Sequence, residues 1–451
     1  MFLPIVVSAQ HLTPLITYST FPEALTFDRA DSILYVGVSP CVVDTLPVPG
    51  LAQYDGTQWS AVPNAMDSFE CNFVHWIQSD AYYQGQLFIA GNFYHAGGLG
   101  PESRGVARWD GSTWHGDGGI KTAPKLLQFD DELWLGGIFD SIGNNAISAL
   151  ARWDGSGWQP FGAYIPNTTN IDEVRAVARY QGALIIGGNL TGMPIAQDVL
   201  EWSGSDWQQL GNGLHGAANG FINAMAEFGG LLYVGGAYWT SDGAPSQNIV
   251  IWDGINWLPF MPGIVVATTQ VLDMKVIDNK LYIAGSFHFT GDNNKYYHLL
   301  QYDGTHLCAV GSLPTFAGNQ TALEVTGNSA EVYFSDYATV LGSDTVNLFA
   351  HWVLADGADT CVQVIAGVSE NTNMAHAEIY PNPANTILNI DDMGPSVRSV
   401  EVLNILGQPV LQTTYTRNAP VNVSALAVGT YTLRLFDARG VPVAMGRFVK
   451  E

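Results

Sequence analysis

Short apolar runs alternate with Gly- and Asp-rich turns along most of the chain. One unit divides into four predicted strands, 222–228, 231–238, 248–252 and 256–260. Gly229-Gly230 and Asp253-Gly254 lie between strands of this unit, and such pairs predict hairpins. In an Asp-Gly hairpin we expect both turn residues at positive φ. The pattern therefore predicts units of four antiparallel strands.

The same unit recurs with a period near fifty residues. An aromatic-Asp-Gly segment, or a Trp-Ser-Gly variant, begins at positions 54, 109, 153, 202, 252 and 302. Most copies are followed by a tryptophan, at Trp59, Trp114, Trp158, Trp207 and Trp257. An apolar motif that mostly ends in Gly precedes each copy, beginning at Leu34, Leu87, Leu133, Leu184, Leu232 and Leu281. A degenerate seventh copy begins at Val332, with Trp352 as its later aromatic residue.

A repeat of this length is typical of solenoids and propellers, and four-stranded units arranged radially form a propeller. Seven copies predict an all-β fold with a seven-bladed β-propeller. We expect the Gly-Gly pairs to let the backbone approach a neighbouring blade, and the tryptophans to fill the space between blades. Aromatic residues that recur at one register are predicted core, namely Phe93, Phe139, Tyr238 and Phe287.

These motifs resemble the kelch repeat, which joins a Gly-Gly after its second strand to an aromatic-Asp segment and a later tryptophan. The resemblance covers about residues 21–365, although the Asp-Gly pair is more regular here than in typical kelch repeats. It implies a kelch-like propeller domain over residues 10–366.

A small polar linker over 367–375 is followed by a module over 376–451 whose sequence pattern differs from that of the repeats. Short alternating strands with Pro and Gly between them predict a small Ig-like β-sandwich. Four motifs follow in order: YPNPA with Tyr380, Pro381, Asn382 and Pro383; NILGQPV with Gly407; GTYTLRL with Gly429 and Tyr431; and a terminal FVK with Lys450.

This ordered set resembles the type A C-terminal sorting domain of the type IX (Por) secretion system of Bacteroidetes. The resemblance implies recognition by an outer-membrane translocon and removal by a sortase-like protease. The mature protein would then be attached to surface lipopolysaccharide or released. The alternative is a plain Ig-like binding domain.

The first residues and the charge agree with export. Residues 1–9 are apolar and end in small residues, which predicts the end of a signal peptide cleaved after Ala9. The basic segment that opens such peptides is missing, so a frayed apolar terminus is the alternative. A net charge of −24 with 17 Lys and Arg excludes nucleic-acid binding. No other run approaches the ~18 apolar residues of a transmembrane segment. We therefore predict a secreted or cell-surface protein.

Four cysteines suit an oxidising compartment. Cys41 and Cys71 flank one repeat and are the predicted disulfide. Cys308 and Cys361 fall on equivalent strands of different repeats, where we expect their Cα atoms to lie more than ~7 Å apart. Their pairing stays open.

No catalytic residue is predicted. The sequence lacks a nucleophile elbow, a zinc helix, a phosphate loop and a dinucleotide fingerprint. The repeated aspartates directly precede Gly, which favours a turn role over a ring of carboxylates: Asp55, Asp110, Asp154, Asp253 and Asp303. The Tyr, Cys and His set of galactose-oxidase-like copper enzymes cannot be assembled.

No metal or other cofactor is predicted either. Gly291-Asp292-Asn293-Asn294 carries oxygen ligands but lacks the full calcium-loop pattern, so a solvated turn is the favoured interpretation.

Strand alternation indicates which face to search for a ligand. Turns after first strands and the Asp-Gly loops share one face, whereas the longer connections share the other, a typical binding surface on a rigid scaffold. Candidate ligand-binding residues there are Tyr94, His95, Trp239, His288, Phe289 and Asp292. Aromatic residues beside Asn and Asp suit a glycan, and a protein ligand stays open.

Two functions from different classes follow. The favoured one is a glycan- or protein-binding adhesion module, and the alternative is a secreted hydrolase or oxidase that acts on extracellular polymer near the propeller axis. Carboxylates that converge in the central channel would favour the enzyme. A channel of Gly, Ala and backbone would favour binding.

Overall fold

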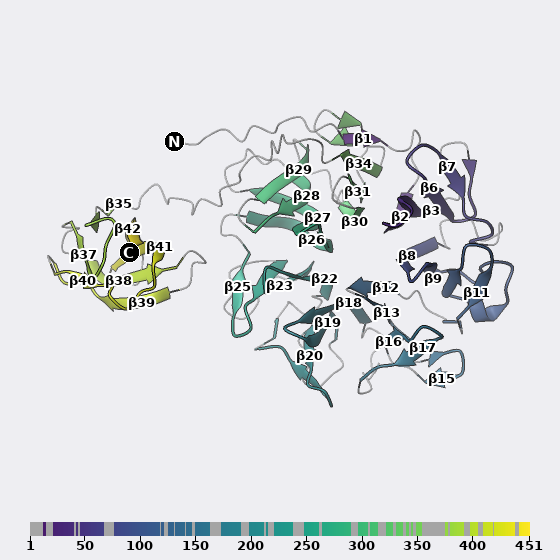
Figure 1. The fold of residues 1–451 in the computed structure, drawn as a ribbon, viewed down its shortest axis with the longest axis horizontal. Coiled ribbons are helices and arrows are strands. Elements are labelled where there is room, and N and C mark those ends of the chain that lie inside the picture. The colour runs from purple at the N-terminus through teal and green to yellow at the C-terminus, as the bar shows by residue number, and fades with distance from the viewer. Residues whose placement is uncertain are drawn as a thin grey trace. The chain divides into compact units, whose positions relative to one another are not determined.

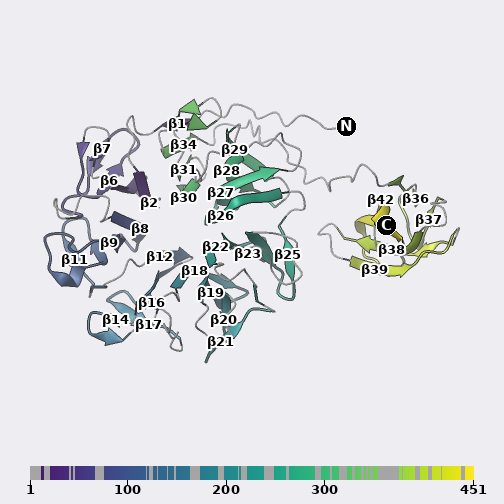
Figure 2. The same cartoon turned by 180° about the vertical axis from the view of Figure 1, so that it is seen from behind.

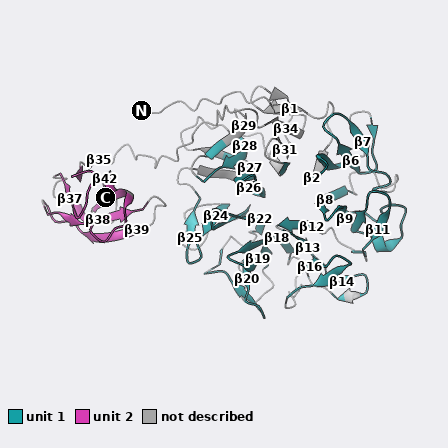
Figure 3. Ribbon diagram, in the orientation of Figure 1, with its two compact units in different colours: residues 1–366 teal, residues 367–451 magenta. Residues whose placement is uncertain are grey.

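The chain forms two compact units, residues 1–366 and residues 367–451 (Figure 3). The structure is a computed structural model. It describes residues 12–14, 21–39, 42–43, 46–66, 76–117, 119–120, 125–129, 131–139, 141–146, 149–162, 173–190, 198–211, 213–214, 221–237, 248–260, 264–289, 296–304, 307–313, 322–327, 331–336, 340–341, 344–345, 349–353, 375–377, 379–391, 397–404, 409–417, 419–437 and 442–451.

The first unit contains seven four-stranded antiparallel sheets, which confirms the predicted seven-bladed propeller (Figure 1). Blade 1 contains β2 (Phe21–Asp28), β3 (Ile33–Ser39), β6 (Leu51–Tyr54) and β7 (Trp59–Ala61). Blade 2 contains β8 (Trp76–Tyr83), β9 (Gln86–Asn92), β10 (Val106–Trp109) and β11 (Trp114–Gly116). Blade 3 contains β12 (Lys125–Phe129), β13 (Glu132–Gly136), β16 (Leu150–Trp153) and β17 (Trp158–Pro160).

The remaining four blades repeat this order. Blade 4 contains β18 (Glu173–Tyr180), β19 (Ala183–Asn189), β20 (Val199–Trp202) and β21 (Trp207–Gln209). Blade 5 contains β22 (Phe221–Phe228), β23 (Leu231–Ala237), β24 (Ile249–Trp252) and β25 (Trp257–Pro259). Blade 6 contains β26 (Ile264–Ile277), β27 (Lys280–Phe289), β28 (Tyr296–Tyr302) and β29 (Leu307–Leu313). Blade 7 contains β30 (Ala322–Gly327), β31 (Glu331–Asp336), β34 (Phe349–Val353) and β1 (Leu12–Pro14).

Short secondary-structure elements lie in the connections between the blade strands. They are β4 (Val42–Val43) with β5 (Leu46–Pro47), β14 (Ser141–Ile142) with β15 (Asn145–Ala146), β32 (Val340–Leu341) with β33 (Asp344–Thr345), and a 3-10 turn, η2 (Pro101–Ser103).

The ring is closed by the two ends of the propeller sequence. Strand β1 pairs with β34, with Leu12 opposite Trp352, so the seventh blade takes its outermost strand from the start of the chain. The innermost strands contact one another in order, and β30 contacts β2 (Figure 2). Strand β1 lies ahead of residue 21, where the repeat was expected to begin, and it was not predicted because its three residues carry no repeat motif.

The two residues of each Gly-Gly pair have different roles. A Cβ atom on the first glycine would press against the next blade: on Gly136 it would lie 2.5 Å from the Val174 carbonyl oxygen. The second glycine faces its own blade, where a Cβ on Gly188 would collide with the Glu173 carbonyl. The innermost strand is bulged there, between Val174 and Ala176. The expected close approach to a neighbouring blade therefore holds for the first glycine, and the second glycine accommodates a bulge.

The Asp-Gly loops differ from the predicted hairpin. Tyr54 pairs with Trp59 and Trp109 with Trp114, so each loop contains four residues rather than two. Only the glycine has positive φ, for example 93° at Gly111. The preceding aspartate accepts the loop hydrogen bonds: Asp110 Oδ1 accepts the Ser112 and Thr113 amides at 2.9 and 2.8 Å. The His115 ring at 2.7 Å, together with these amide bonds, holds the pKa of Asp110 below its usual range. The predicted turn role of these aspartates agrees with this geometry.

Aromatic side chains fill the spaces between blades. Trp158 of blade 3 is 4% exposed, and its ring centre lies 6.1 Å from that of Phe88 in blade 2. Trp114 and Trp207 are likewise buried. Of the residues predicted as core from their common register, Phe93, Phe139 and Phe287 are buried, and Tyr238 lies outside the described residues.

The second unit is a sandwich of two sheets. The larger contains β35 (Ala375–His376), β42 (Pro442–Lys450), β41 (Gly429–Asp437), β38 (Val397–Leu403) and β39 (Pro409–Thr414). The smaller contains β36 (Ile379–Tyr380), β37 (Ile387–Ile390) and β40 (Val421–Asn422). Their core includes Leu388, Val402, Leu433 and Phe448. The predicted small β-sandwich is confirmed.

One backbone position with positive φ precedes the third strand in several blades, at Gly50, Gly105, Ala149, Asp198 and Asn248. Its carbonyl accepts a hydrogen bond from the end of the second strand, as from Gly188 to Asp198 at 3.1 Å. The Asp198 side chain is buried, and burial raises its pKa to about 7. The equivalent Asn248 keeps the same backbone conformation without an ionisable group.

Replacing Asp198 with Asn should stabilise the propeller in a pH-dependent way. The folded pKa of about 7 lies above the unfolded value of ~3.9, so the folded state keeps a proton that the unfolded state has lost, and stability falls as the pH rises from ~4 to about 7. At pH 8 we expect Asp198→Asn to raise the free energy of unfolding by about 1–4 kcal/mol. Near pH 4 the gain should almost vanish. Urea unfolding at both pH values measures it.

The reverse change, Asn248→Asp, is the matched control and should destabilise the protein at pH 8 more than at pH 4. A stability difference that is the same at both pH values would contradict the assignment.

Candidate functional site

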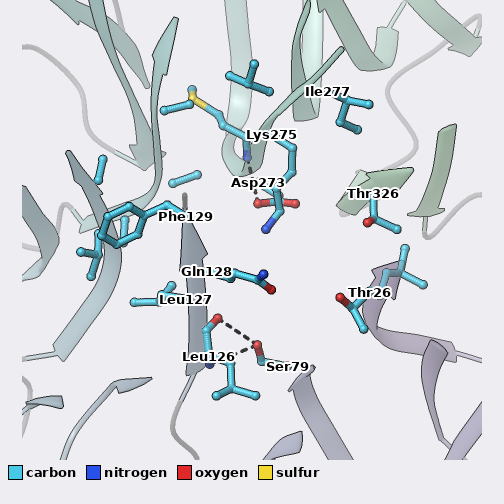
Figure 4. A pocket seen from close by; sticks show the side chains of 18 of the residues that line it. Thr26, Ser79, Leu126, Leu127, Gln128, Phe129, Asp273, Lys275, Ile277 and Thr326 are labelled. Atoms are coloured by element: carbon cyan, nitrogen blue, oxygen red, sulfur yellow. Dashed lines mark hydrogen bonds between the residues drawn. The ribbon is translucent and has the colours of Figure 1, made fainter. Parts of the chain in front are cut away.

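The central channel of the propeller contains a cavity of about 640 Å³ (Figure 4). All seven innermost strands line it: β2, β8, β12, β18, β22, β26 and β30. Ligand pockets commonly have volumes of ~300–1,000 Å³. The channel is therefore large enough for a small ligand, and its lining decides what it can bind.

Polar side chains in the channel connect neighbouring blades. Ser79 in β8 is 3% exposed, and its Oγ lies 3.1 Å from both the amide nitrogen and the carbonyl oxygen of Leu126 in β12. Asp273 in β26 accepts the Met274 amide at 2.9 Å and the Val325 amide of β30 at 3.1 Å. The inner edge of an innermost strand has no partner strand, so these side chains bind backbone groups that the sheet leaves open.

A second set of contacts crosses from blade 4 to blade 6. Arg175 donates to Glu173 at 2.7 Å and to Asn223 Oδ1 at 3.2 Å. Asn223 in turn donates to the Val271 carbonyl at 2.9 Å. The guanidinium of Arg175 also lies over the Phe221 ring, 4.4 Å from its centre. Arg175 and Asn223 thus hold three successive blades together.

The lining is strongly charged. Five cationic residues take part: Arg29, Lys125, Arg175, Arg179 and Lys275. Four acidic residues do so as well: Asp28, Asp80, Glu227 and Asp273. Arg179 pairs with Glu132 at 2.8 Å. Within the described part of the chain, Lys125 and Lys275 have neither an ion pair nor a hydrogen bond from the ammonium group.

This lining differs from both of the channel linings that were expected to distinguish an enzyme from a binding module. The channel is not made of Gly, Ala and backbone, and the Asp273 carboxylate accepts backbone amides instead of standing beside a second carboxylate. Among the described residues, no group of three or more His, Cys, Asp or Glu side chains is placed to hold a metal ion. None of the residues that line the channel was predicted as a site residue from the sequence.

An aromatic pair joins blades 1 and 2, with Tyr35 in β3, the second strand of blade 1, and Tyr82 in β8, the innermost strand of blade 2. Tyr35 and Tyr82 stack with ring centres 5.8 Å apart. Burial, with the Tyr82 hydroxyl and the Asp28 carboxylate adding to it, raises the pKa of Tyr35 to about 12. Both phenols therefore stay neutral hydrogen-bonding groups at physiological pH.

The candidate ligand residues predicted from the sequence belong to the longer connections. Tyr94 and His95 follow β9, and Tyr94 is 42% exposed with Arg104 4.5 Å from its ring centre. His288 and Phe289 end β27, and the structure does not describe their side chains. Trp239 and Asp292 lie outside the described residues, as does Gly291–Asn294 as a whole. The six therefore remain predictions.

Cys308 in β29 is disulfide-bonded. Cys41, Cys71 and Cys361 all lie outside the described residues, so the predicted Cys41–Cys71 pair stays a prediction.

The motif residues of the second unit gather around its C-terminal strand. Asn382 donates to the Arg447 carbonyl at 3.1 Å and accepts the Val449 amide at 2.9 Å, so the YPNP segment is tied to β42. Tyr431, in β41 with Gly429, donates to the Ala427 carbonyl at 2.8 Å. Lys450 is buried and donates to the Glu451 carbonyl. Tyr380 is 52% exposed, Pro381 and Pro383 flank Asn382, and Gly407 lies outside the described residues.

Residues 378–448 match the family described as the secretion system C-terminal sorting domain. The C-terminal unit is therefore a type IX sorting domain, which indicates export to the cell surface or secretion. A search of curated proteins gave no match. No described helix is long and apolar enough to cross a membrane.

Solved structures with a similar fold share little sequence with the chain. PorZ, a surface component of the type IX secretion system of Porphyromonas gingivalis, is 14% identical, with 95% of this chain and 65% of PorZ covered and a TM-score of 0.32. The extracellular domain of BT3049 from B. thetaiotaomicron is 10% identical, with 96% and 56% covered and a TM-score of 0.41. A fungal alcohol oxidase of the AA5 family, in complex with copper, is 12% identical, with 98% and 100% covered and a TM-score of 0.41.

The chain thus spans less than two thirds of the length of the first two of these structures. With such low identities and TM-scores, the likenesses carry no argument about function.

Removing the Ser79 hydroxyl should loosen the contact between blades 2 and 3. Ser79→Ala leaves the Leu126 amide and carbonyl without their buried partner, which should lower the free energy of unfolding by about 1–3 kcal/mol. Ser60→Ala, the same change at an exposed site of β7, should alter it by less than about 0.5 kcal/mol. Denaturant unfolding of both variants makes the comparison. Equal effects would show that the bridge contributes nothing specific.

Proposed function

We propose that the protein is an exported ligand-binding module, in which the sorting domain delivers the propeller to the cell surface and the propeller binds a glycan or a protein. The observation that carries this proposal is the channel cavity of about 640 Å³, bordered by the innermost strands of a closed ring. A closed ring fixes its lining in place without the ligand, and preorganised sites of this kind favour binding.

The finer parts of the prediction belong to the same proposal. The propeller is of the kelch-like kind, residues 1–9 end a signal peptide, and the chain comes from a member of the Bacteroidetes. Its partners are the outer-membrane translocon and a sortase-like protease, which act through the C-terminal unit. Ligand binding as proposed needs no cofactor.

The long connections beside the channel would provide the second part of the binding surface. Tyr94 offers an exposed ring, and the Arg104 guanidinium lies against its face. Aromatic rings and planar guanidinium groups are common anchors at binding surfaces because they cover apolar area and form directed polar contacts.

A secreted hydrolase or oxidase is the second candidate. The presence of four carboxylates in the channel lining favours it, since carboxylates can serve as general acids or bases: Asp28, Asp80, Glu227 and Asp273. Product analysis of every glycan that the protein binds separates the two candidates, because an enzyme would release shortened or oxidised products.

Tyr94→Ala should weaken ligand binding at the long-loop face. We expect about a tenfold loss of affinity for the best ligand found on a glycan array or in a surface-protein screen with the full chain. The control is Ile255→Ala, which removes an exposed apolar side chain (80% exposed) from an Asp-Gly loop at the other end of the strands. If Tyr94→Ala binds like the wild type, the long-loop face is the wrong surface.

Removing residues 367–451 should abolish surface delivery in a host with a type IX system. The propeller has its own core within residues 1–366, so we expect the shortened chain to fold but to stay inside the cell envelope. Protease treatment of intact cells measures the exposed fraction, and a reporter protein fused to residues 367–451 should become accessible. Surface exposure of the shortened chain at the full-length level would refute the role of the tail.

A further inference from the structure

The seven innermost strands can be aligned by their pairing with the second strands. At one aligned position, some blades carry polar side chains and others carry apolar ones. This position lies opposite the second residue of the apolar motif in every blade. Its occupants around the ring are Thr26, Ala81, Leu127, Ala178, Ala226, Lys275 and Thr326. Six of these residues line the channel cavity, and Ala81 does not.

The polar members of this set are neighbours. Lys275, Thr326 and Thr26 belong to β26, β30 and β2, which contact one another in that order around the ring. We call these three residues the polar arc. Ala81, Leu127, Ala178 and Ala226 occupy the next four blades and form the apolar arc. Figure 4 shows Thr26 and Thr326 on one side of the cavity and Leu127 on the other.

The polar arc has unused binding capacity. All three side chains are half-buried, and within the described part of the chain neither the Lys275 ammonium nor the two hydroxyls have a hydrogen-bond partner. The nearest acid along the strand, Asp273, accepts backbone amides from Met274 and Val325. A half-buried ammonium group that forms no direct ion pair keeps its capacity to bind an anion, and such a bond would offset part of the cost of removing it from water.

We propose that this level of the channel binds an acidic sugar, a ring that carries a carboxylate. The carboxylate would pair with Lys275, and sugar hydroxyls would bond to Thr326 and Thr26. The C–H face of the ring would lie against the members of the apolar arc that line the cavity, Leu127, Ala178 and Ala226. A simple phosphate matches the ammonium but has no apolar face for Leu127 and the alanines. This inference rests on the proposed binding function and specifies its ligand class.

The test compares sugars that differ only in the carboxylate. The full chain is titrated calorimetrically with the methyl glycosides of glucuronic and galacturonic acid and with those of glucose and galactose. At least one uronide should bind at least tenfold more tightly than its neutral counterpart. Lys275→Gln should remove that preference, and Lys275→Arg should restore most of it, because the guanidinium keeps the charge.

Lys280→Gln is the matched control, since it removes the same charge from the same hairpin at a residue outside the cavity lining, and it should leave binding unchanged. Thr26→Val, nearly equal in volume, should weaken uronide binding several-fold. Thermal unfolding of each variant checks that the ring is intact.

Equal affinity for uronides and neutral glycosides, or an unchanged uronide affinity in Lys275→Gln, would overturn the inference. If neutral glycans or proteins still bind in a manner that depends on Tyr94, the proposed binding function survives that failure. If no glycan or protein binds the wild type at all, the proposed function fails with it.

Discussion

The close contact between successive blades is the constraint on which the propeller depends. In blades 1, 3, 4 and 5 the first glycine of the repeated motif lies so close to the next blade that a side chain would be crowded: a Cβ on Gly37 would meet the Ile77 carbonyl oxygen at 3.1 Å, and one on Gly235 would lie 2.5 Å from Met274. Blades 2 and 6 have alanine, the smallest side chain, at this position, as Ala90 and Ala284. Because the contact is made near the axis, it brings the innermost strands together, while the larger tryptophans spread the blades farther out. The wedge shape of each blade and the closure of the ring follow from this difference.

The same contact explains why the channel is polar. Each innermost strand is the edge of its sheet, so its backbone groups on the inner side need partners other than a strand. Ser79 and Asp273 meet this need from the preceding blade, at the same register position and one repeat apart from their targets. Polar side chains in the channel thus serve two purposes. Some bind the backbone and hold the ring, and those that are left, above all Lys275, are available to a ligand.

Much of this architecture could be predicted from the sequence, because the outer three strands of each blade carry the repeat. The aromatic-Asp-Gly segments and the glycine-terminated strands fixed the blade number. Strand β1 could not be found, since the three residues Leu12–Pro14 carry no repeat motif. The loop length was wrong because the aromatic pairs, such as Trp109 with Trp114, set the register, and the Asp-Gly pair alone does not.

The channel residues were not predicted for a related reason: they lie on the innermost strands, which carry neither of the two repeated motifs. Counting along each innermost strand from its glycine-paired residue would have aligned Thr26, Lys275 and Thr326 in the sequence. The charges in the channel indicate which side chain is available to a ligand. The chain has a net charge of −24, yet Arg175 and Arg179 in the channel are neutralised by Glu173 and Glu132, and Lys275 is not.

Charges on the outer surface are screened beyond ~8 Å at physiological salt, whereas a partly buried charge is screened much less. An anion that pairs directly with Lys275 in the channel is therefore affected much more by that nearby charge than by the screened charges of the outer surface.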